Sequence, residues 1–316
     1  MAEYRDHRLR LRLLSPLGTP LQSDTIVGHL AWQAAFREGD QGVKGFLEPF
    51  LIGRPPFILS DGFPAGLLPR PLLPRGPGLT RSSERLSLEK FTRDKHLLKA
   101  PLVTVEDFRE LCSGSGKISS SPMENPWIST QTAHAAIDRS TDTTTPGGQL
   151  YETLAEALPG EKVDLYLRAA EDGADRVAGM LEDISRIGYG RYKTVGMGQF
   201  RVESCQPWDE FRGPEEADGF VSLSSFMPAS TDPTEGRWRI RIKRGFLGEG
   251  AGGGYPYKKP LIQFEPGAVF RAGPEGPRPF YGRVVAGVAP GMPEAVQCCY
   301  TLSVPCRYAP LKAGAG

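Results

Sequence analysis

The most regular pattern near the start of the chain is an alternation of leucine with arginine in residues 7–13. Because successive side chains of a strand point to opposite faces, this alternation predicts a strand with a leucine face and an arginine face. Residues 237–243 repeat the design with basic residues between tryptophan and isoleucine, and residues 162–168 hold an apolar residue at every second position. We therefore expect three strands, two of which have one basic face.

Two segments have the spacing of amphipathic helices. Apolar residues in the range 26–34 recur three or four positions apart, which is the period of one helix face. Ser23 or Asp24 is placed to cap this helix, and Gly39 to end it. The same spacing in residues 175–187 predicts a second helix, and the glycine that follows it directly suits the position after a helix C-terminus.

A long insertion separates the two helices. Residues 53–79 are dense in proline and glycine, residues 87–111 have helical patterns broken near Pro101, and residues 113–150 are rich in serine and threonine. We expect the last of these to be a strand that runs into a polar hairpin or extended loop. The predicted order is strand, helix, insertion, strands, helix, loop and strand, which fits a ferredoxin-like β-α-β-β-α-β domain with an insertion.

The remaining chain, from about residue 207, has strand patterns alone. They lie at residues 219–226, 237–243, 259–264, 281–288 and 296–304. A second, mostly β domain is therefore predicted. Since both halves contain a strand with one apolar and one arginine face, the two domains look like a duplication.

Composition places the chain among soluble globular proteins. Its 316 residues suit about two domains, and 39% hydrophobic and 24% charged residues are ordinary for a folded protein. The net charge is only +1. Whole-chain charge therefore gives nucleic-acid binding no support, and a basic site has to be local.

Neither the cysteines nor the histidines predict a metal or redox site. The five cysteines form no C-x-x-C pair, and none of the four histidines stands at ligand spacing from a cysteine or carboxylate. We expect no cofactor and no metal. No apolar run approaches the roughly 20 residues that cross a bilayer, so we expect a cytoplasmic protein without membrane contact.

The sharpest local feature is the segment 186–201, which holds four glycines, four basic residues and no acidic residue. Glycines allow another backbone to come close and let the loop's N–H groups point outward. Arg191 and Lys193 can pair with phosphates, while Tyr189 and Tyr192 can stack on bases. The segment predicts a loop that grips an RNA backbone. The alternative is a helix-to-strand turn that is merely rich in glycine.

The sequence does not contain the common nucleotide-binding motifs, because residues that these motifs require are replaced. G-x-G-x-x-G needs glycine where Lys193 stands, and the P-loop-like residues 114–117 have Leu111 in place of the first glycine and Ile118 in place of Ser/Thr. For catalysis the chain offers His29, a possible general base toward a ribose hydroxyl, although a packed helical histidine explains it as well.

Three further features have two interpretations each. The basic strand faces in residues 8–12 and 237–243 fit either a solvated face with salt bridges or a surface that follows a phosphate backbone. Asp138 and Asp142 fit either a metal site or ordinary hairpin hydrogen bonds.

Several segments together resemble the RAMP proteins of CRISPR effector complexes, in particular the subunit of type III-A (Csm) complexes that caps the 5′ end of the crRNA. The similar segments are residues 20–30, 99–103 with Phe108, 136–141 through 147–151, 188–200, and 258–260 with 267–270. The stretch 188–200 matches the RAMP glycine-rich loop and is the most specific of them. The ending, residues 297–307, departs from the family.

The resemblance implies an α+β fold of two ferredoxin-like (RRM-like) domains, residues 1–206 and 207–316, the first with a long insertion and a thumb-like hairpin. It implies a non-catalytic scaffold that holds the repeat-derived 5′ tag of the crRNA. The implied partners are crRNA, the large polymerase/cyclase-bearing subunit and the repeating backbone RAMP, with target RNA nearby.

The loop and the resemblance together predict the binding residues. Those expected to contact RNA are Ser23, Asp24, Thr25, His29, Arg139, Gly188, Tyr189, Gly190, Arg191, Tyr192, Lys193, Thr194, Gly196, Gly198, Gln199, Arg239, Arg241 and Lys258. Those expected in the thumb, at the junction between tag and guide, are Asp138, Thr141, Thr143 and Thr144.

Two other functions within the same family stay open. A RAMP-type crRNA-processing endoribonuclease would use His29 as base and Lys193 or Arg191 at the leaving phosphate. The backbone RAMP would cut target RNA through an aspartate near the thumb, although the chain is long for that role.

Overall fold

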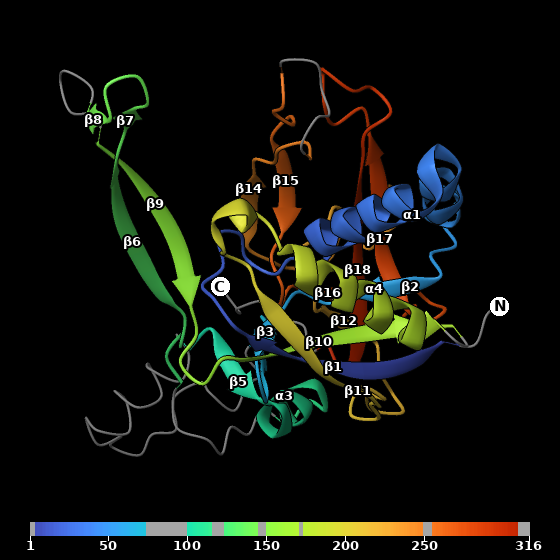
Figure 1. The fold of residues 1–316 in the computed structure, drawn as a ribbon. Coiled ribbons are helices and arrows are strands. Elements are labelled where there is room, and N and C mark those ends of the chain that lie inside the picture. The colour runs from blue at the N-terminus through green and yellow to red at the C-terminus, as the bar shows by residue number, and fades with distance from the viewer. Residues whose placement is uncertain are drawn as a thin grey trace, which may run out of the picture.

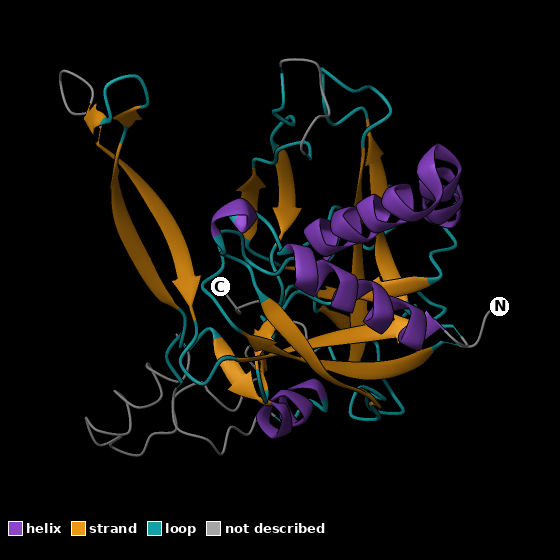
Figure 2. Ribbon diagram, viewed as in Figure 1, coloured by secondary structure: helices purple, strands orange, loops and turns teal. Residues whose placement is uncertain are grey.

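The structure, a computed structural model, describes residues 4–73, 100–115, 123–144, 150–170, 173–248 and 255–308. The fold is α+β, and every strand pair in it is antiparallel (Figures 1 and 2). Among the described helices, none combines the length and the apolar character that crossing a bilayer requires.

The first sheet contains the two alternating strands predicted in the first half. Its strand order is β11-β1-β10-β2, with β3 also paired to β10. The bounds are β1 Arg5–Leu13, β2 Phe57–Leu59, β3 Phe63–Pro64, β10 Lys162–Ala169 and β11 Phe200–Pro207. The predicted strands at 7–13 and 162–168 are confirmed. The leucines of β1 are buried because they face the core, while its arginines lie on the opposite face.

Two helices pack beside this sheet (Figure 2). Helix α4 (Gly173–Ile187) confirms the helix predicted at 175–187 and packs on β10 and β11. Gly188 follows it with φ +91°, and its amide donates to the Ile184 carbonyl, as the C-terminal position requires. Helix α1 (Ser23–Leu51) packs on α4 and on β18 (Val296–Cys306).

The predictions for the two ends of the first helix were wrong. Gln22 occupies the N-cap position without a side-chain cap bond, and Ser23 and Asp24 lie inside the first turn, both buried. Gly39 does not end the helix. It adopts φ +64° and kinks the chain, which is helical again up to Leu51. Glycine allows the kink because a left-handed residue there meets no Cβ clash.

The insertion forms small elements at the base and one long two-stranded hairpin. The bounds are β4 Leu67–Pro69, β5 Leu102–Thr104, α3 Val105–Cys112, β6 Ile128–Ala135, β7 Ile137–Asp138, β8 Thr143–Thr144 and β9 Leu150–Ala157. Strand β6 pairs with β9 along its whole length, and this hairpin projects away from the body of the protein (Figure 1). The predicted polar hairpin is confirmed. The helical prediction for residues 87–99 lies outside the described residues.

The second half forms a five-stranded sheet and a separate two-stranded hairpin. The sheet order is β13-β16-β12-β18-β17, and the hairpin is β14-β15. The bounds are β12 Gly219–Ser222, β13 Gly236–Arg237, β14 Ile240–Lys243, β15 Leu261–Phe264, β16 Val269–Arg271 and β17 Phe280–Ala286. Buried residues of both halves form one continuous hydrophobic cluster. The boundary near residue 207 stays a prediction.

The prediction of a single strand at residues 237–243 was wrong in two respects. It is two short strands, β13 and β14, that pair in different sheets. Its isoleucines are also the exposed side, with Ile240 and Ile242 about 60% accessible, whereas Lys243 points inward. The alternation is that of a strand, but alternation alone does not say which face is covered.

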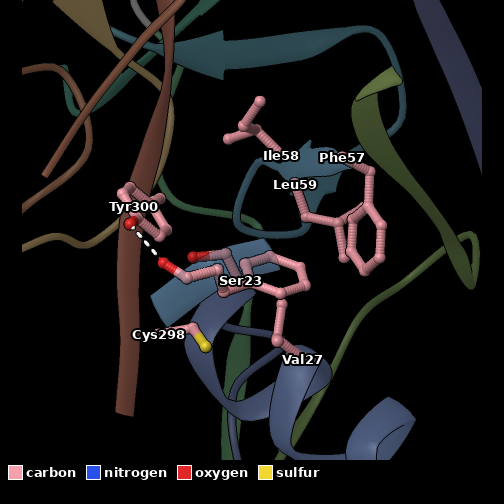
Figure 3. Close-up of a pocket in the computed structure, with 8 residues that line it drawn as sticks. Ser23, Val27, Phe57, Ile58, Leu59, Cys298 and Tyr300 are labelled. Atoms are coloured by element: carbon pink, nitrogen blue, oxygen red, sulfur yellow. Dashed lines mark hydrogen bonds between the residues drawn. The ribbon is translucent and has the colours of Figure 1, made fainter. Parts of the chain in front are cut away.

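A small cavity marks the contact of α1 with β2 and β18 (Figure 3). Ser23, Val27 and Cys298 line it, and the Tyr300 hydroxyl donates to the Phe50 carbonyl at 2.7 Å beside it. Its volume, about 10 Å³, is that of a single water molecule. This cavity is therefore a packing feature and too small for a nucleotide.

Candidate nucleic-acid interface

A wide groove runs along α1 between the two halves of the chain. Its walls come from α1, from the glycine-rich loop (residues 188–199), and from segments 241–248 and 292–298. Its volume is about 1650 Å³, well above the roughly 300–1,000 Å³ of ordinary small-molecule pockets. The groove thus suits an extended ligand.

Basic side chains from both halves meet in this groove. Arg191 and Lys193 come from the glycine-rich loop, and Arg241, Arg244 and Lys258 from the second half. The acidic residues on its walls, besides Asp24, are Asp40, Glu48 and Glu294. The positive charge that the whole chain lacks is therefore concentrated locally beside the loop.

The loop's backbone does not present its amides as predicted. Most amides from 188 to 199 donate inside the protein: Gly190 to His29 Nε2 at 3.1 Å, Arg191 to Thr19 Oγ1 at 3.0 Å and Gly198 to the Pro16 carbonyl at 2.9 Å. A loop that packs on its neighbours has to satisfy its buried N–H groups. The loop therefore offers its side chains, chiefly Arg191 and Lys193, and few of its amides.

Tyr189, which was predicted to stack on bases, is buried in this structure. Its ring is 1% exposed, and its hydroxyl donates to the Pro20 carbonyl at 2.9 Å. A Cβ on Gly198 would lie 2.0 Å from the Tyr189 carbonyl oxygen. Gly198 is therefore needed for the close packing of the loop backbone on Tyr189. Gly196, by contrast, is exposed with open space around it.

His29 is a packed residue of α1. Its Nε2 accepts the Gly190 amide, and its ring contacts Tyr189 with centroids 4.9 Å apart. Burial, and the nearby charges of Lys193 and Lys258, lower the pKa of its imidazole to about 4. His29 is therefore neutral at pH 7, with one ring nitrogen already occupied.

We expect the His29 imidazole to stay neutral down to about pH 4, which an NMR titration of its ring protons measures. Because its folded pKa lies below the unfolded value near 6.5, the unfolded state binds the proton first, and stability falls as the pH drops from about 6.5 to 4. The loss reaches about 3 kcal/mol. The His29→Gln variant, whose amide oxygen can accept the Gly190 N–H, lacks this component. Titration near pH 6.5 would contradict the assignment.

Ser23 and Asp24 are both buried, although Asp24 belongs to the groove lining. Asp24 is 2% exposed and forms a buried ion pair with Lys243, while Gln263 donates to it at 2.7 Å. The Lys243 ammonium also donates to Thr25 Oγ1 at 2.6 Å. This polar contact joins α1 to the β14-β15 hairpin and so positions one wall of the groove against the other.

The structure gathers one part of the predicted residues in the groove and leaves the others outside. On its walls lie Asp24, Thr25, His29, Gly188, Gly190, Arg191, Tyr192, Lys193, Thr194, Arg241 and Lys258. Gly196, Gly198 and Gln199 do not line the groove, and Arg239 is exposed before β14. RNA contact by each of these residues stays a prediction.

The arginine face of β1 is paired within the protein. Arg10 forms a two-pronged ion pair with Asp164 at 2.8 and 2.9 Å, and Arg12 contacts Glu161 at 3.3 Å. Arg8 stacks on the Trp208 ring at 4.7 Å. Of the two interpretations of this face, the structure favours a solvated face with salt bridges.

The tip of the β6-β9 hairpin, formed by β7 and β8, carries the predicted thumb residues and lies far from α1 (Figure 1). Asp138 accepts from the Ser140 amide at 2.8 Å, and this pairing with Ser140 lowers the pKa of its carboxyl. The Thr141 and Thr143 hydroxyls are 2.9 Å apart. These contacts are hairpin hydrogen bonds, and in the described part of the chain no cluster of His, Cys, Asp or Glu could hold a metal ion. Arg139 is exposed here.

The sequence analysis missed the aromatic residues of the groove. Trp32 and Phe36 of α1 and Phe246 of the second half line it. The available signal was the placement of Phe246, Tyr255 and Tyr257 on both sides of the glycine-rich stretch 248–254, next to a pair of lysines. Aromatic rings beside basic residues are typical of single-stranded nucleic-acid sites.

The fold resembles chains of solved Csm structures. A chain of the Csm1-Csm4 cassette with cA4 superposes with a TM-score of 0.60 at 18% identity, over 98% of this chain and 100% of that chain. A chain of the same cassette with AMPPNP gives 0.58 at 17% identity, with the same coverage. A chain of the Csm3-Csm4 subcomplex gives 0.56 at 11% identity, over 93% and 98%.

Csm4 is the component that these three structures have in common. The chain thus shares its fold with a chain of each of these structures over nearly its whole length. No protein-family profile matches the sequence, and a search among curated proteins gives no match.

Proposed function

We propose that this protein is a non-catalytic crRNA-binding scaffold subunit of a type III-A CRISPR interference complex. It holds the repeat-derived 5′ tag in the groove along α1 and docks the large polymerase/cyclase-bearing subunit and the backbone RAMP. The observation that carries the proposal is the convergence of cations from both halves on one groove, beside the glycine-rich loop. The fold, shared with chains of Csm1-Csm4 and Csm3-Csm4 structures, supports the choice of complex and partners.

A scaffold role fits the groove better than a nuclease role. A general base has to reach the proton that it removes. The Nε2 atom of His29 accepts the Gly190 amide, and the residue is half-buried. The interpretation of His29 as a packing residue is therefore favoured over the processing endoribonuclease, and incubation with labelled repeat RNA distinguishes the two.

We interpret the first sheet as the predicted ferredoxin-like domain. Its order β11-β1-β10-β2, with α1 after the first strand and α4 before the last, supports this assignment. From residue 207 on, the described residues form strands without a helix. A second ferredoxin-like domain is therefore supported by the resemblance and by its antiparallel sheet alone.

The projecting β6-β9 hairpin is proposed as the thumb. Most of its side chains are exposed, including Leu150, Leu154 and Ile137 at 63–75%. Apolar side chains on a projecting ribbon are available to a partner in an assembly. In the proposed role the tip separates tag from guide, next to the backbone RAMP and the target RNA.

The Arg191→Ala/Lys193→Ala variant tests the groove. We expect its affinity for a short labelled single-stranded RNA to fall on the order of tenfold at physiological salt, because two phosphate contacts are lost. The dependence of log K on log salt should become shallower by about 1.4, since each phosphate contact on a single strand contributes about 0.7. Filter binding over a salt series measures both.

The matched control is Arg12→Ala, which removes an exposed cation from the β1 face. Its RNA affinity should equal that of the wild type, and thermal melts should show all variants folded. Sequencing of RNA that co-purifies with the protein supplies the second test: a uniform repeat-derived 5′ end supports the proposal, and equal RNA affinity of the double variant contradicts it.

A further inference from the structure

Three exposed aromatic rings lie together on the extension of the β14-β15 hairpin. Phe246 stands opposite Tyr257 in an antiparallel bridge, with ring centroids 5.0 Å apart, and Tyr255 lies 5.5 Å from Tyr257. Their exposed fractions are 46%, 51% and 54%. We call these three residues the aromatic platform. Most other phenylalanines and tyrosines of the described residues are buried or half-buried, so the platform is a distinct surface feature.

Hydrogen bonds pair the two backbone segments that carry the platform. The Leu247 amide donates to the Pro256 carbonyl at 2.8 Å, and the Lys258 amide to the Gly245 carbonyl at 2.9 Å. On the other side Gly248 lies against Trp32 of α1, because a Cβ there would come within 2.5 Å of the indole nitrogen. Two ladder bonds and the contact with α1 order the backbone beneath the rings, so that less backbone entropy is lost on binding.

Arg191 connects the platform to the glycine-rich loop. Its guanidinium lies 5.0 Å from the Phe246 ring centroid and 5.8 Å from that of Tyr192. Phe246 itself lines the groove together with Arg244, which is exposed. The aromatic surface is therefore continuous with the cationic one, and a chain whose phosphates pair with Arg191 brings its bases within reach of the rings.

Aromatic rings and cations together recognise unpaired nucleotides. The π-faces accept any base by stacking, while the cations pair with the phosphates between them. The bases of duplex RNA would not stack on the rings, because they are already stacked on one another. The aliphatic side chains of the same hairpin, such as Ile262 at 58% exposure, lack such a face.

We propose that Phe246, Tyr255 and Tyr257 form a base-stacking platform that makes the groove selective for unpaired RNA, with Arg191 pairing to the adjoining phosphate. This inference rests on the proposed function and adds the class of ligand: single-stranded nucleotides with exposed bases, bound without a sequence code.

Fluorescence anisotropy with two probes tests the platform. One probe is a short single-stranded RNA, and the other is an abasic ribose-phosphate strand of the same length. Wild-type protein should bind the RNA at least about tenfold more tightly, since each stacked base contributes a factor of about this size. Phe246→Ala and Tyr257→Ala should each lower RNA affinity about tenfold and leave the abasic strand unaffected. Arg191→Ala should weaken both probes.

Conservative variants separate stacking from apolar contact. Phe246→Leu keeps an apolar side chain without a ring and should lose affinity, whereas Tyr257→Phe keeps the ring and should retain it. Ile262→Ala, on the same hairpin, should match the wild type. If wild-type protein binds the two probes equally, or if the ring variants lose affinity for both probes alike, the rings do not stack on bases, and the proposed phosphate contacts in the groove are unaffected by this result. If neither probe binds, the proposed function fails as well. Unchanged RNA affinity in the ring variants, with loss of a protein partner, assigns the rings to a protein interface instead.

Discussion

We expect Asp24→Ala to lower the free energy of unfolding by about 3–5 kcal/mol. Removal of one partner from a buried ion pair leaves the other charge unpaired, and the Lys243 side chain is only 14% exposed. The Gln263 amide, which donates to the same carboxylate, also loses its acceptor. Urea denaturation monitored by circular dichroism measures the loss.

The Asp24–Lys243 pair also has a defined pH dependence. Burial alone would raise the pKa of the Asp24 carboxyl, but the Lys243 charge and the hydrogen bonds from Lys243 and Gln263 outweigh it and hold the pKa below its ordinary value. A carboxyl with a lowered folded pKa adds stability above its unfolded pKa of about 3.9, and this contribution is lost as the pH falls through the folded pKa. The Asp24→Ala variant should lack this pH-dependent part of the free energy of unfolding.

The control for Asp24 is the exposed pair of Arg12 and Glu161, whose side chains are about half accessible. Glu161→Ala should change stability by less than about 1 kcal/mol, because water screens the pair. A double variant, Asp24→Asn/Lys243→Met, should recover much of the loss, since it leaves no isolated buried charge. An Asp24→Ala protein as stable as Glu161→Ala would show that the pair does not hold the groove walls together.

We expect Gly198→Ala to destabilise the protein by about 2–5 kcal/mol and to impair RNA binding at the same time. Gly198 has φ +72°, and a Cβ there would lie 2.0 Å from the Tyr189 carbonyl oxygen, so the loop has to move. The movement breaks the bonds from Tyr189 to Gly198 and from Gly198 to Pro16. Arg191 and Lys193 belong to the same loop, so their placement in the groove changes as well.

Gly196→Ala is a matched control two residues away. Its φ is +88°, but no atom lies within 4 Å of the position that a Cβ would take there, so only the backbone strain of about 1–2 kcal/mol applies. Thermal unfolding of the two variants separates the contributions of strain and of collision. Equal melting temperatures would contradict the close packing of Gly198 on Tyr189.

Local patterns were sufficient for much of the fold. The period of two in residues 7–13 and the period of three to four in 175–187 each specify one buried face, and β1 and α4 follow them. The glycine after the second helix was placed correctly because its backbone geometry is a local requirement. The serine- and threonine-rich hairpin was also predicted, since turns and strand pairing there are close in sequence.

Features that depend on distant contacts were not predicted. Tyr189 and Asp24 look like exposed polar residues in the sequence, yet Pro20 and Lys243, which are remote from them along the chain, cover or pair them. The continuation of α1 beyond Gly39 likewise depends on packing: Phe46 and Phe50 are buried in the common core, which stabilises the second helical segment.

The amino-acid sequence by itself determined strands β1 and β10, helix α4, the basic glycine-rich loop and the polar hairpin, because periodicity and backbone preference act over a few residues. Only the tertiary structure decided which loop side chains face outward, that cations of both halves share one groove, and that Phe246 meets Arg191 there. Those facts depend on contacts between residues tens to hundreds of positions apart, for which a single sequence holds no local signal.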